Sequence, residues 1–205
     1  MQQASQKEQS QPEHNCPVAR TSHLIKIFEK ILAKNIIETH QKMNPKQHGF
    51  LSGRSCLSQL LKHCNKILEE FEKSNNVDVI YYSDFTKAFD RVNHIILLNK
   101  LKTFVINGKI SVWIHNFQSN RQQCVAVSGT TSSEAQVRRG IPQGSVLGPL
   151  LFLIHISDIN YEIVDSAVSC FANDHRILLG KKMKRTHRCY KMIYMSCTNM
   201  QIQII

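Results

Sequence analysis

Three side chains that end in oxygen, those of Asp84, Asn173 and Asp174, follow two strand-like runs of the sequence. Asp84 comes after the β-branched and aromatic run 77–83, and the other two come after the apolar run 168–172. Phosphoryl transfer from a nucleoside triphosphate uses two hard cations about 4 Å apart, and magnesium takes oxygen ligands. Carboxylates must therefore converge from different strands, and this spacing indicates such a two-metal site. Asn173 adds a neutral amide oxygen beside Asp174.

Both motifs also have an interpretation that involves no chemistry. Asp84 could be the N-cap of the helical segment that follows it, because a carboxylate accepts hydrogen bonds from the first backbone amides of a helix. Asn173 and Asp174 could be ordinary turn residues between two strands. The residue types alone leave these alternatives open.

The elements that would position these residues mix helical and strand periodicities. Apolar spacing predicts helices over residues 22–39, 55–73, 92–105, 113–117 and 150–159. β-branched and aromatic runs predict strands over 77–83, 124–128, 135–139, 168–172 and 177–179. The second and third strands would form one hairpin, and the last two would form another with residues 173–175 at its tip. Thr21 or Ser22 is expected to cap the first helix, and one side of the second helix is apolar.

Several segments resemble the reverse transcriptases of non-LTR (LINE-like) retrotransposons. Residues 81–94, YYSDFTKAFDRVNH, are similar to the family's first catalytic motif, and residues 139–150, RGIPQGSVLGPL, to its second palm motif. SCFAND at 169–174 stands where the family has an aromatic-Ala-Asp-Asp turn. Residues 47–55, QHGFLSGRS, resemble its fingers motif, and residues 21–32 the segment before it. The resemblance covers residues 17–180, in the family's order and at its spacing.

The resemblance implies a role for each residue of the metal site. Asp84 would be a ligand shared by both ions, Asp174 a second carboxylate ligand, and the backbone carbonyl of Phe85 could add another. The implied cofactor is Mg²⁺, two ions in an active enzyme, with Mn²⁺ as a substitute. Asn173 replaces the first aspartate of the family's pair, so the charge of the three side chains falls from −3 to −2. Losing one anionic ligand predicts chemistry slower by about a thousandfold.

The resemblance also implies a nucleotide-binding set. Phe89 matches the family's steric gate, a bulky ring that excludes a 2′-hydroxyl, although plain core packing is the alternative. Gln143 and Gly144 match residues that line the incoming nucleotide, where glycine allows a close backbone approach. Arg54 would touch the triphosphate or the template, the alternative being an exposed arginine without a specific contact.

Other positions depart from the family's pattern. Cys16 stands where the family has an arginine, and Ser83 replaces a leucine before the catalytic aspartate. Beyond Gly180 the helical segment and primer grip expected next are not recognisable, and neither is an upstream endonuclease domain. These departures predict a truncated reverse transcriptase domain without a thumb.

Composition bounds the choice of partners and compartment. The chain of 205 residues has 26 Lys and Arg against 15 Asp and Glu, a net charge of +11, which favours polyanions such as nucleic acid. Its seven cysteines include no C-x-x-C pair, so reduced thiols in an intracellular protein are expected. The polar amino terminus lacks a signal core, and the longest apolar run, 146–156, is too short to span a bilayer. A cytoplasmic or nuclear protein that is not secreted and has no membrane partner is expected.

These observations predict an α+β fold: a polymerase palm, with an antiparallel sheet backed by helices, and partial helical fingers. The expected parts are a disordered N-terminus (1–14), fingers (15–76), palm (77–180) and a basic tail with little packed structure (181–205). The predicted function is an RNA-directed DNA polymerase by descent, catalytically impaired, with RNA template, DNA primer and deoxynucleoside triphosphates as partners. A non-catalytic nucleic-acid-binding protein and an inert structural or interaction fragment remain as alternatives. The oligomeric state is left open.

Overall fold

A computed structural model describes residues 18–19, 21–39, 43–73, 77–85, 87–104, 106, 108–119, 121–127, 130–158, 167–180 and 202–204. The helices are α1 (His23–Thr39), α2 (Cys56–Glu72), α3 (His94–Thr103), α4 (Lys109–Gln118) and α5 (Gly148–His155). The strands are β1 (Val77–Phe85), β2 (Arg121–Gln123), β3 (Ala126–Val127), β4 (Thr130–Thr131), β5 (Ala135–Val137), β6 (Ala167–Phe171), β7 (Asp174–Gly180) and β8 (Ile202–Ile204). The predicted segment 1–14, Cys16 and most of the predicted tail lie outside the described residues.

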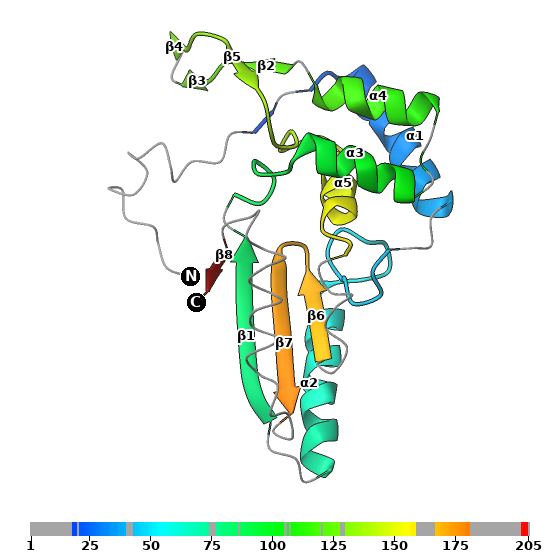
Figure 1. Ribbon diagram of the computed structural model, residues 1–205, viewed down its shortest axis with the longest axis vertical. Helices are drawn as coiled ribbons and strands as arrows, with labels where there is room; N and C mark the ends of the chain where they lie inside the picture. The colour runs from blue at the N-terminus through cyan, green and yellow to red at the C-terminus, as the bar shows by residue number, and fades with distance from the viewer. Residues whose placement is uncertain are drawn as a thin grey trace.

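Four strands form one sheet in the order β6-β7-β1-β8, and each neighbouring pair is antiparallel. β8 lies in the tail, where the sequence predicts little packed structure, yet it pairs with the end of β1. The end of β1 and the turn between β6 and β7 both point toward the helical half of the molecule (Figure 1). The predicted α+β class with an antiparallel sheet is therefore confirmed.

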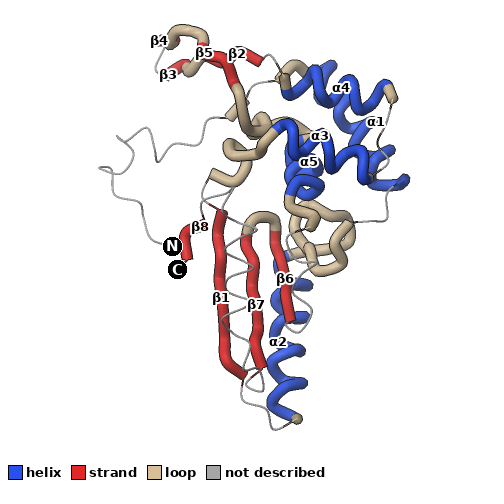
Figure 2. The backbone as a smooth tube through the Cα atoms, viewed as in Figure 1, coloured by secondary structure: helices blue, strands red, loops and turns tan. Residues whose placement is uncertain are grey.

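The helical half holds the apolar core. α5 lies among α1, α3 and α4 (Figure 2) and buries seven of its eight residues, because Leu-Leu-Phe-Leu-Ile leaves it no polar face. Leu97 and Leu101 of α3 and Ile114 of α4 are fully buried against it. Burying each such side chain contributes about 1.5–3 kcal/mol. This cluster supports the loops that carry several of the predicted site residues.

Side-chain caps set the beginnings of the first two helices. Ser22 Oγ accepts from the backbone amide of Ile25 at 3.3 Å, so Ser22 rather than Thr21 makes the capping contact of α1. At α2, Ser55 Oγ accepts from Ser58 N at 3.1 Å, and Ser58 Oγ accepts from Ser55 N at 2.9 Å. This reciprocal capping box fixes the start of α2 at Cys56, one residue after the predicted start.

The apolar side of α2 faces outward. The residues that α2 buries are Gln59 and His63, and Gln59 Nε2 donates to Ser169 Oγ of β6 at 3.5 Å. The exposed apolar residues of α2 are Leu57, Leu60, Leu61, Leu68 and Phe71. An amphipathic helix usually turns its apolar face to the core. Here α2 packs on the sheet through polar side chains instead.

Two predicted hairpins differ from the structure. In place of one hairpin from 124–128 and 135–139, β2 pairs with β5 and β3 pairs with β4. The regular ladder of β3 and β4 ends at Ser132, because the Ser132 hydroxyl takes the place of its backbone carbonyl as the acceptor for Val125 N. In the second hairpin Phe171 pairs with Asp174, so the turn holds two residues and Asp174 begins β7 rather than lying at the tip. In the part of the chain that the structure describes, no helix has the length and apolarity to cross a membrane.

Candidate active site

Asp84 and Asp174 lie on neighbouring strands at the same end of the sheet. β1 and β7 are antiparallel and align Tyr82 with Arg176 and Ser83 with His175. Asp84 follows Ser83 in β1, and Asp174 precedes His175 in β7. The two positions predicted from sequence therefore lie at the same end of neighbouring strands.

The interpretation of Asp84 as a helix cap is wrong. β1 extends to Phe85, so Asp84 lies within the strand. The next helix, α3, begins at His94, and its cap is Asn93, whose Oδ1 accepts from Ile95 N at 2.9 Å. Asp84 is thus too far along the chain to cap it.

Ala172 and Asn173 form the two-residue turn between β6 and β7. Ala172 has φ of 54°, in the left-handed region. That conformation costs a residue with a Cβ roughly 1–2 kcal/mol, and a two-residue hairpin turn commonly requires it at the first position. Asn173 is half-buried and Asp174 is exposed, so the strained turn presents the second carboxylate at its outer edge.

A loop from the predicted fingers motif holds this turn. Gln47 Nε2 donates to Ala172 O at 3.0 Å, and Gln47 Oε1 accepts from Ala172 N at 2.8 Å. The backbone amides of Gly49 and Ala172 share that oxygen. His48 N donates to Cys170 O at 2.7 Å, and Cys170 N donates to Lys46 O at 2.9 Å. The loop is therefore bonded to the turn and to the end of β6.

Gly49 permits this close approach. A Cβ at Gly49 would lie 2.2 Å from the backbone nitrogen of Ala172 and 2.9 Å from its Cα. Any larger residue would force the loop off the turn, because both contacts are with backbone that cannot rotate away.

Arg54, predicted to touch triphosphate or template, is bonded to the same loop. Its Nη1 donates to the carbonyls of Pro45, at 3.0 Å, and of Gln47. The side chain is exposed. It thus holds the backbone of Gln47 while lying at the surface.

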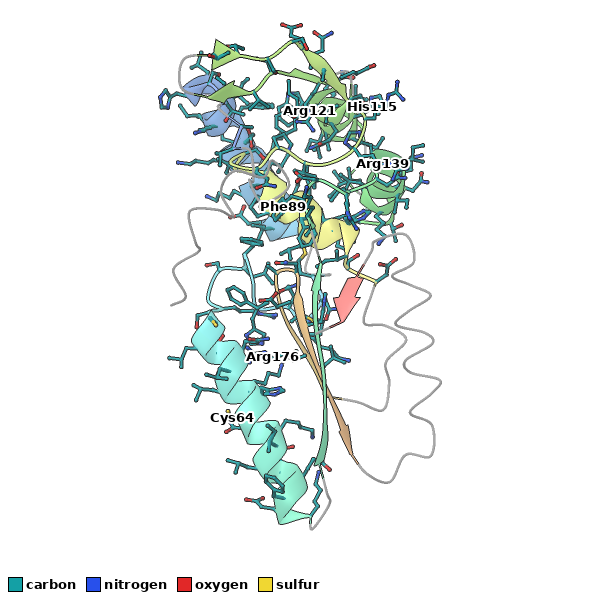
Figure 3. All side chains as sticks on the ribbon, turned by 90° about the vertical axis from the view of Figure 1, so that its left-hand side faces the viewer. Cys64, Phe89, His115, Arg121, Arg139 and Arg176 are labelled. Carbon is teal, nitrogen blue, oxygen red and sulfur yellow. The ribbon has the colours of Figure 1, made fainter. Side chains whose placement is uncertain are left out.

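Phe89 is half-buried in an aromatic cluster near the junction of the sheet and the helical half (Figure 3). Its ring stacks on Phe152 of α5, with centroids 4.9 Å apart, and meets the edge of Phe50 at 6.2 Å. Core packing, the alternative to a steric gate, therefore accounts for the contact on one face of the Phe89 ring. Phe50 follows Gly49 directly, so this contact also brings the loop of Gln47 next to Phe89.

The segment with Gln143 and Gly144 packs against the turn that follows β1. Gln143 Nε2 donates to Asp90 Oδ1 at 3.1 Å, and Ile141 N donates to Phe89 O at 2.9 Å. Gly144 is exposed with φ of 92°, a conformation that favours glycine. The structure thus brings Phe89 and Gln143 together, both predicted as nucleotide-binding residues.

The neighbour of Asp174 in β7 adds no positive charge at neutral pH. Burial lowers the pKa of His175 to about 4, although a hydrogen bond with the backbone of Asn173 opposes the shift. His175 is therefore neutral at pH 7. The His175 ring therefore does not balance the negative charge of Asp174 at pH 7.

The donors at this end of the sheet are oxygens from Asp84, Asn173 and Asp174. Hard cations such as Mg²⁺ and Mn²⁺ prefer this donor set to nitrogen or sulfur. Among the side chains that the structure describes, no three His, Cys, Asp or Glu residues cluster as a complete metal site. The residue types fit a magnesium site, with the amide of Asn173 in place of a third carboxylate.

Sequence reasoning assigned no role to Gln47 or Asp90, although both lie within the motifs it quoted. Gln47 stands two residues before Gly49, and Asp90 directly follows Phe89. Both act through contacts with residues far along the chain. Only their place inside a motif could have pointed to a role for these two residues, because neither belongs to the apolar pattern of a helix or strand.

The family model described as Reverse transcriptase (RNA-dependent DNA polymerase) matches residues 7–204. The probable RNA-directed DNA polymerase from transposon BS of Drosophila melanogaster is 32% identical over 156 residues, covering 75% of this chain and 17% of that protein. The RNA-directed DNA polymerase from mobile element jockey of Drosophila funebris is 32% identical over 146 residues, covering 70% and 16%. The chain thus spans less than a fifth of the length of these relatives.

Among solved structures, apo telomerase from Candida tropicalis matches with a TM-score of 0.60 and 9% identity, covering 88% of this chain and 35% of that one. The same telomerase truncated from the C-terminal domain matches with a TM-score of 0.57 and 11% identity, covering 88% and 38%. At this identity the likeness concerns the fold alone.

Proposed function

This chain belongs to the reverse transcriptase family, and we propose that it carries the nucleotidyl-transfer site of an RNA-directed DNA polymerase at Asp84 and Asp174. In this proposal residues 77–180 are the palm and residues 15–76 part of the fingers. The observation that carries the proposal is the antiparallel pairing of β1 and β7, in which Asp84 and Asp174 each stand one residue beyond the aligned pair of Ser83 and His175. The substrates would be an RNA template, a DNA primer and deoxynucleoside triphosphates.

The carboxylates of Asp84 and Asp174 would hold Mg²⁺, with the Phe85 carbonyl and the Asn173 amide oxygen as further donors. Divalent ions bound there would supply charge neutralisation for the triphosphate and activation of the primer hydroxyl. Gln143, held by Asp90, and Gly144 would line the base and sugar of the incoming nucleotide. The free edge of Phe89 would exclude a 2′-hydroxyl, and Arg54 would approach the triphosphate.

Asn173 would weaken this site. An amide oxygen is neutral, so one charge is lost where two cations and a triphosphate must be balanced. Electrostatic stabilisation of this kind contributes several kcal/mol to a transition state, so the loss corresponds to about a thousandfold in rate. We therefore propose that the unmodified chain is catalytically impaired.

Primer extension on an RNA template tests both parts of the proposal. The chain, its Asn173→Asp variant and the double variant Asn173→Asp/Asp84→Asn would be compared with Mg²⁺ and with Mn²⁺. We expect extension by Asn173→Asp, about a thousandfold less by the unmodified chain, and none by the double variant. Equal extension by the chain and Asn173→Asp would refute the impairment. Extension that survives Asp84→Asn would refute the site.

A second candidate function, nucleic-acid binding without turnover, is favoured by the charge of the chain. Besides the net charge of +11, the two residues that follow β5, Arg138 and Arg139, are exposed. Figure 3 shows Arg139 and the half-buried Arg121 of β2 in the same half of the molecule. Filter binding of RNA across a salt series measures it, because each phosphate contact makes the affinity fall steeply with salt. Retention that does not change with salt would exclude this function.

A further inference from the structure

Gln47 stands out among the buried polar residues because its side chain bonds twice to a single distant residue. It is 5% exposed, and its amide both donates to and accepts from the backbone of Ala172, 125 positions along the chain. The side chain thus acts toward the turn as a neighbouring strand would act. The terminal amide can do this because it has both a donor and an acceptor.

The residue bonded in this way is the strained one. Ala172 is held at a φ of 54°, and Asn173 and Asp174 are the next two residues. Strained backbone persists where the surroundings over-determine it, and here the surroundings are Gln47 and the close contact of Gly49. Without these contacts only the pairing of β6 with β7 would hold the turn, and the position of Asp174 would be less firmly set.

We propose that Gln47 is a positioning residue for the metal-binding turn: its amide fixes Ala172 and thereby sets where Asn173 and Asp174 stand relative to Asp84. We call the two hydrogen bonds between Gln47 and Ala172 the clamp. The identity of the metal site rests on the proposed function, whereas the clamp rests on these contacts of Gln47. Arg54 Nη1 donates to the backbone carbonyl of Gln47, so Arg54 also helps to hold Gln47 in place. Substitutions at the two positions should then be non-additive.

Gln59 provides a matched control. It is also a glutamine, 1% exposed, and it also bonds to the β6 segment, through Ser169 Oγ at 3.5 Å. The hydrogen bond of its side chain is with Ser169 of β6 and not with the turn, so its loss would test burial and fold without testing the clamp.

The experiment compares the full chain with Gln47→Ala, Gln47→Glu and Gln59→Ala. Hydrogen exchange at the Ala172 amide reports the clamp, because that amide donates to Gln47 Oε1. Mn²⁺ affinity, measured by electron paramagnetic resonance in the native and Asn173→Asp backgrounds, reports the position of the ligands. Urea unfolding measures the change in global stability of each variant. The changes in exchange and in Mn²⁺ affinity are compared with that change.

We expect Gln47→Ala to expose the Ala172 amide far beyond any change in global stability and to weaken Mn²⁺ binding about tenfold or more. Gln47→Glu should do the same, because an ionised carboxylate cannot donate to Ala172 O. Gln59→Ala should change stability without either local effect. Unchanged exchange in Gln47→Ala, or an equal loss in Gln59→Ala, would overturn the clamp.

Failure of the proposed function gives a different result. If neither background binds Mn²⁺, the metal site is refuted, while exchange at Ala172 still decides whether Gln47 holds the turn. A third result is possible in a background that binds Mn²⁺. If Gln47→Ala speeds exchange at Ala172 but leaves the Mn²⁺ affinity unchanged, the positioning role is overturned.

Discussion

His155 makes the stability of this protein sensitive to acid. The residue lies on α5, is 3% exposed, and its Nδ1 has no hydrogen-bond partner among the described residues. The pKa of His155 is lowered to about 4, chiefly by burial and also by the positive charge of Lys100, while Asp158 opposes the shift. The perturbation is acidification from pH 7 to pH 4.5.

The sign and size of the effect follow from the two pKa values. Between the unfolded value of 6.5 and the folded value of about 4, the unfolded state binds more protons. Stability from His155 is therefore present above pH 6.5 and is lost as the pH falls toward 4. One pKa unit corresponds to about 1.36 kcal/mol, so a shift of 6.5 − 4 gives about 3 kcal/mol in full, of which about 2 kcal/mol is lost by pH 4.5.

Urea unfolding followed through the fluorescence of Trp113, the single tryptophan, measures this loss. Carboxylates also titrate in the range, so the test is the difference between native chain and His155→Leu at each pH. His155→Leu should be neutral or stabilising at pH 7 and should lose about 2 kcal/mol less than the native chain by pH 4.5. The exposed His115→Gln is the control and should keep the native slope. An unchanged slope in His155→Leu would refute the reasoning.

Two further predictions concern the loops and their supports. Gly49→Ala should cost about 3 kcal/mol or more, because its Cβ would lie 2.2 Å from Ala172 N, whereas Gly53→Ala, with φ of 75° and open space, should cost only about 1–2 kcal/mol of backbone strain. Urea midpoints compare the two, and a larger cost at Gly53 would contradict the contact. Glu29 is fully buried and its Oε2 accepts from Leu147 N at 2.8 Å, at the start of α5, so Glu29→Ala should cost about 2–3 kcal/mol. Substitution of an exposed glutamate such as Glu38 is the comparison. If Glu29→Ala also lost less than about 0.5 kcal/mol of stability, the hydrogen bond to Leu147 N would contribute nothing.

The periodic elements were predictable from sequence. The helices corresponding to α1 and α2 begin and end within one residue of the predicted ranges, because Ser22 and Ser55 are caps whose effect is local. The strand before Asp84 was also predicted, since β-branched and aromatic runs favour extended backbone wherever they occur. Its two extra residues, Asp84 and Phe85, pair with β8, a segment more than 110 positions along the chain.

Features that depend on contacts between distant segments were not predictable. The apolar pattern of α2 predicted that this segment is helical, but it did not predict which side of the helix faces the sheet. In the structure the polar side of α2 packs on the sheet. The hairpin of 124–139 was divided by hydrogen bonds of Ser132 that no periodicity reveals. Propensity acts within a few residues, whereas these outcomes depend on which surfaces meet.

The sequence by itself determined the family, the α+β class and the presence of two acidic positions at strand ends, because each is encoded in residue types at fixed short spacings. It also determined that position 173 is uncharged, since an amide carries no charge in any fold. Only the tertiary structure decided that Asp84 and Asp174 lie at the same end of neighbouring strands, and that Gln47 bonds to the turn that precedes Asp174. Those relations join residues 90 and 125 positions apart, and they exist only once the strands have paired and the loop has closed on Ala172.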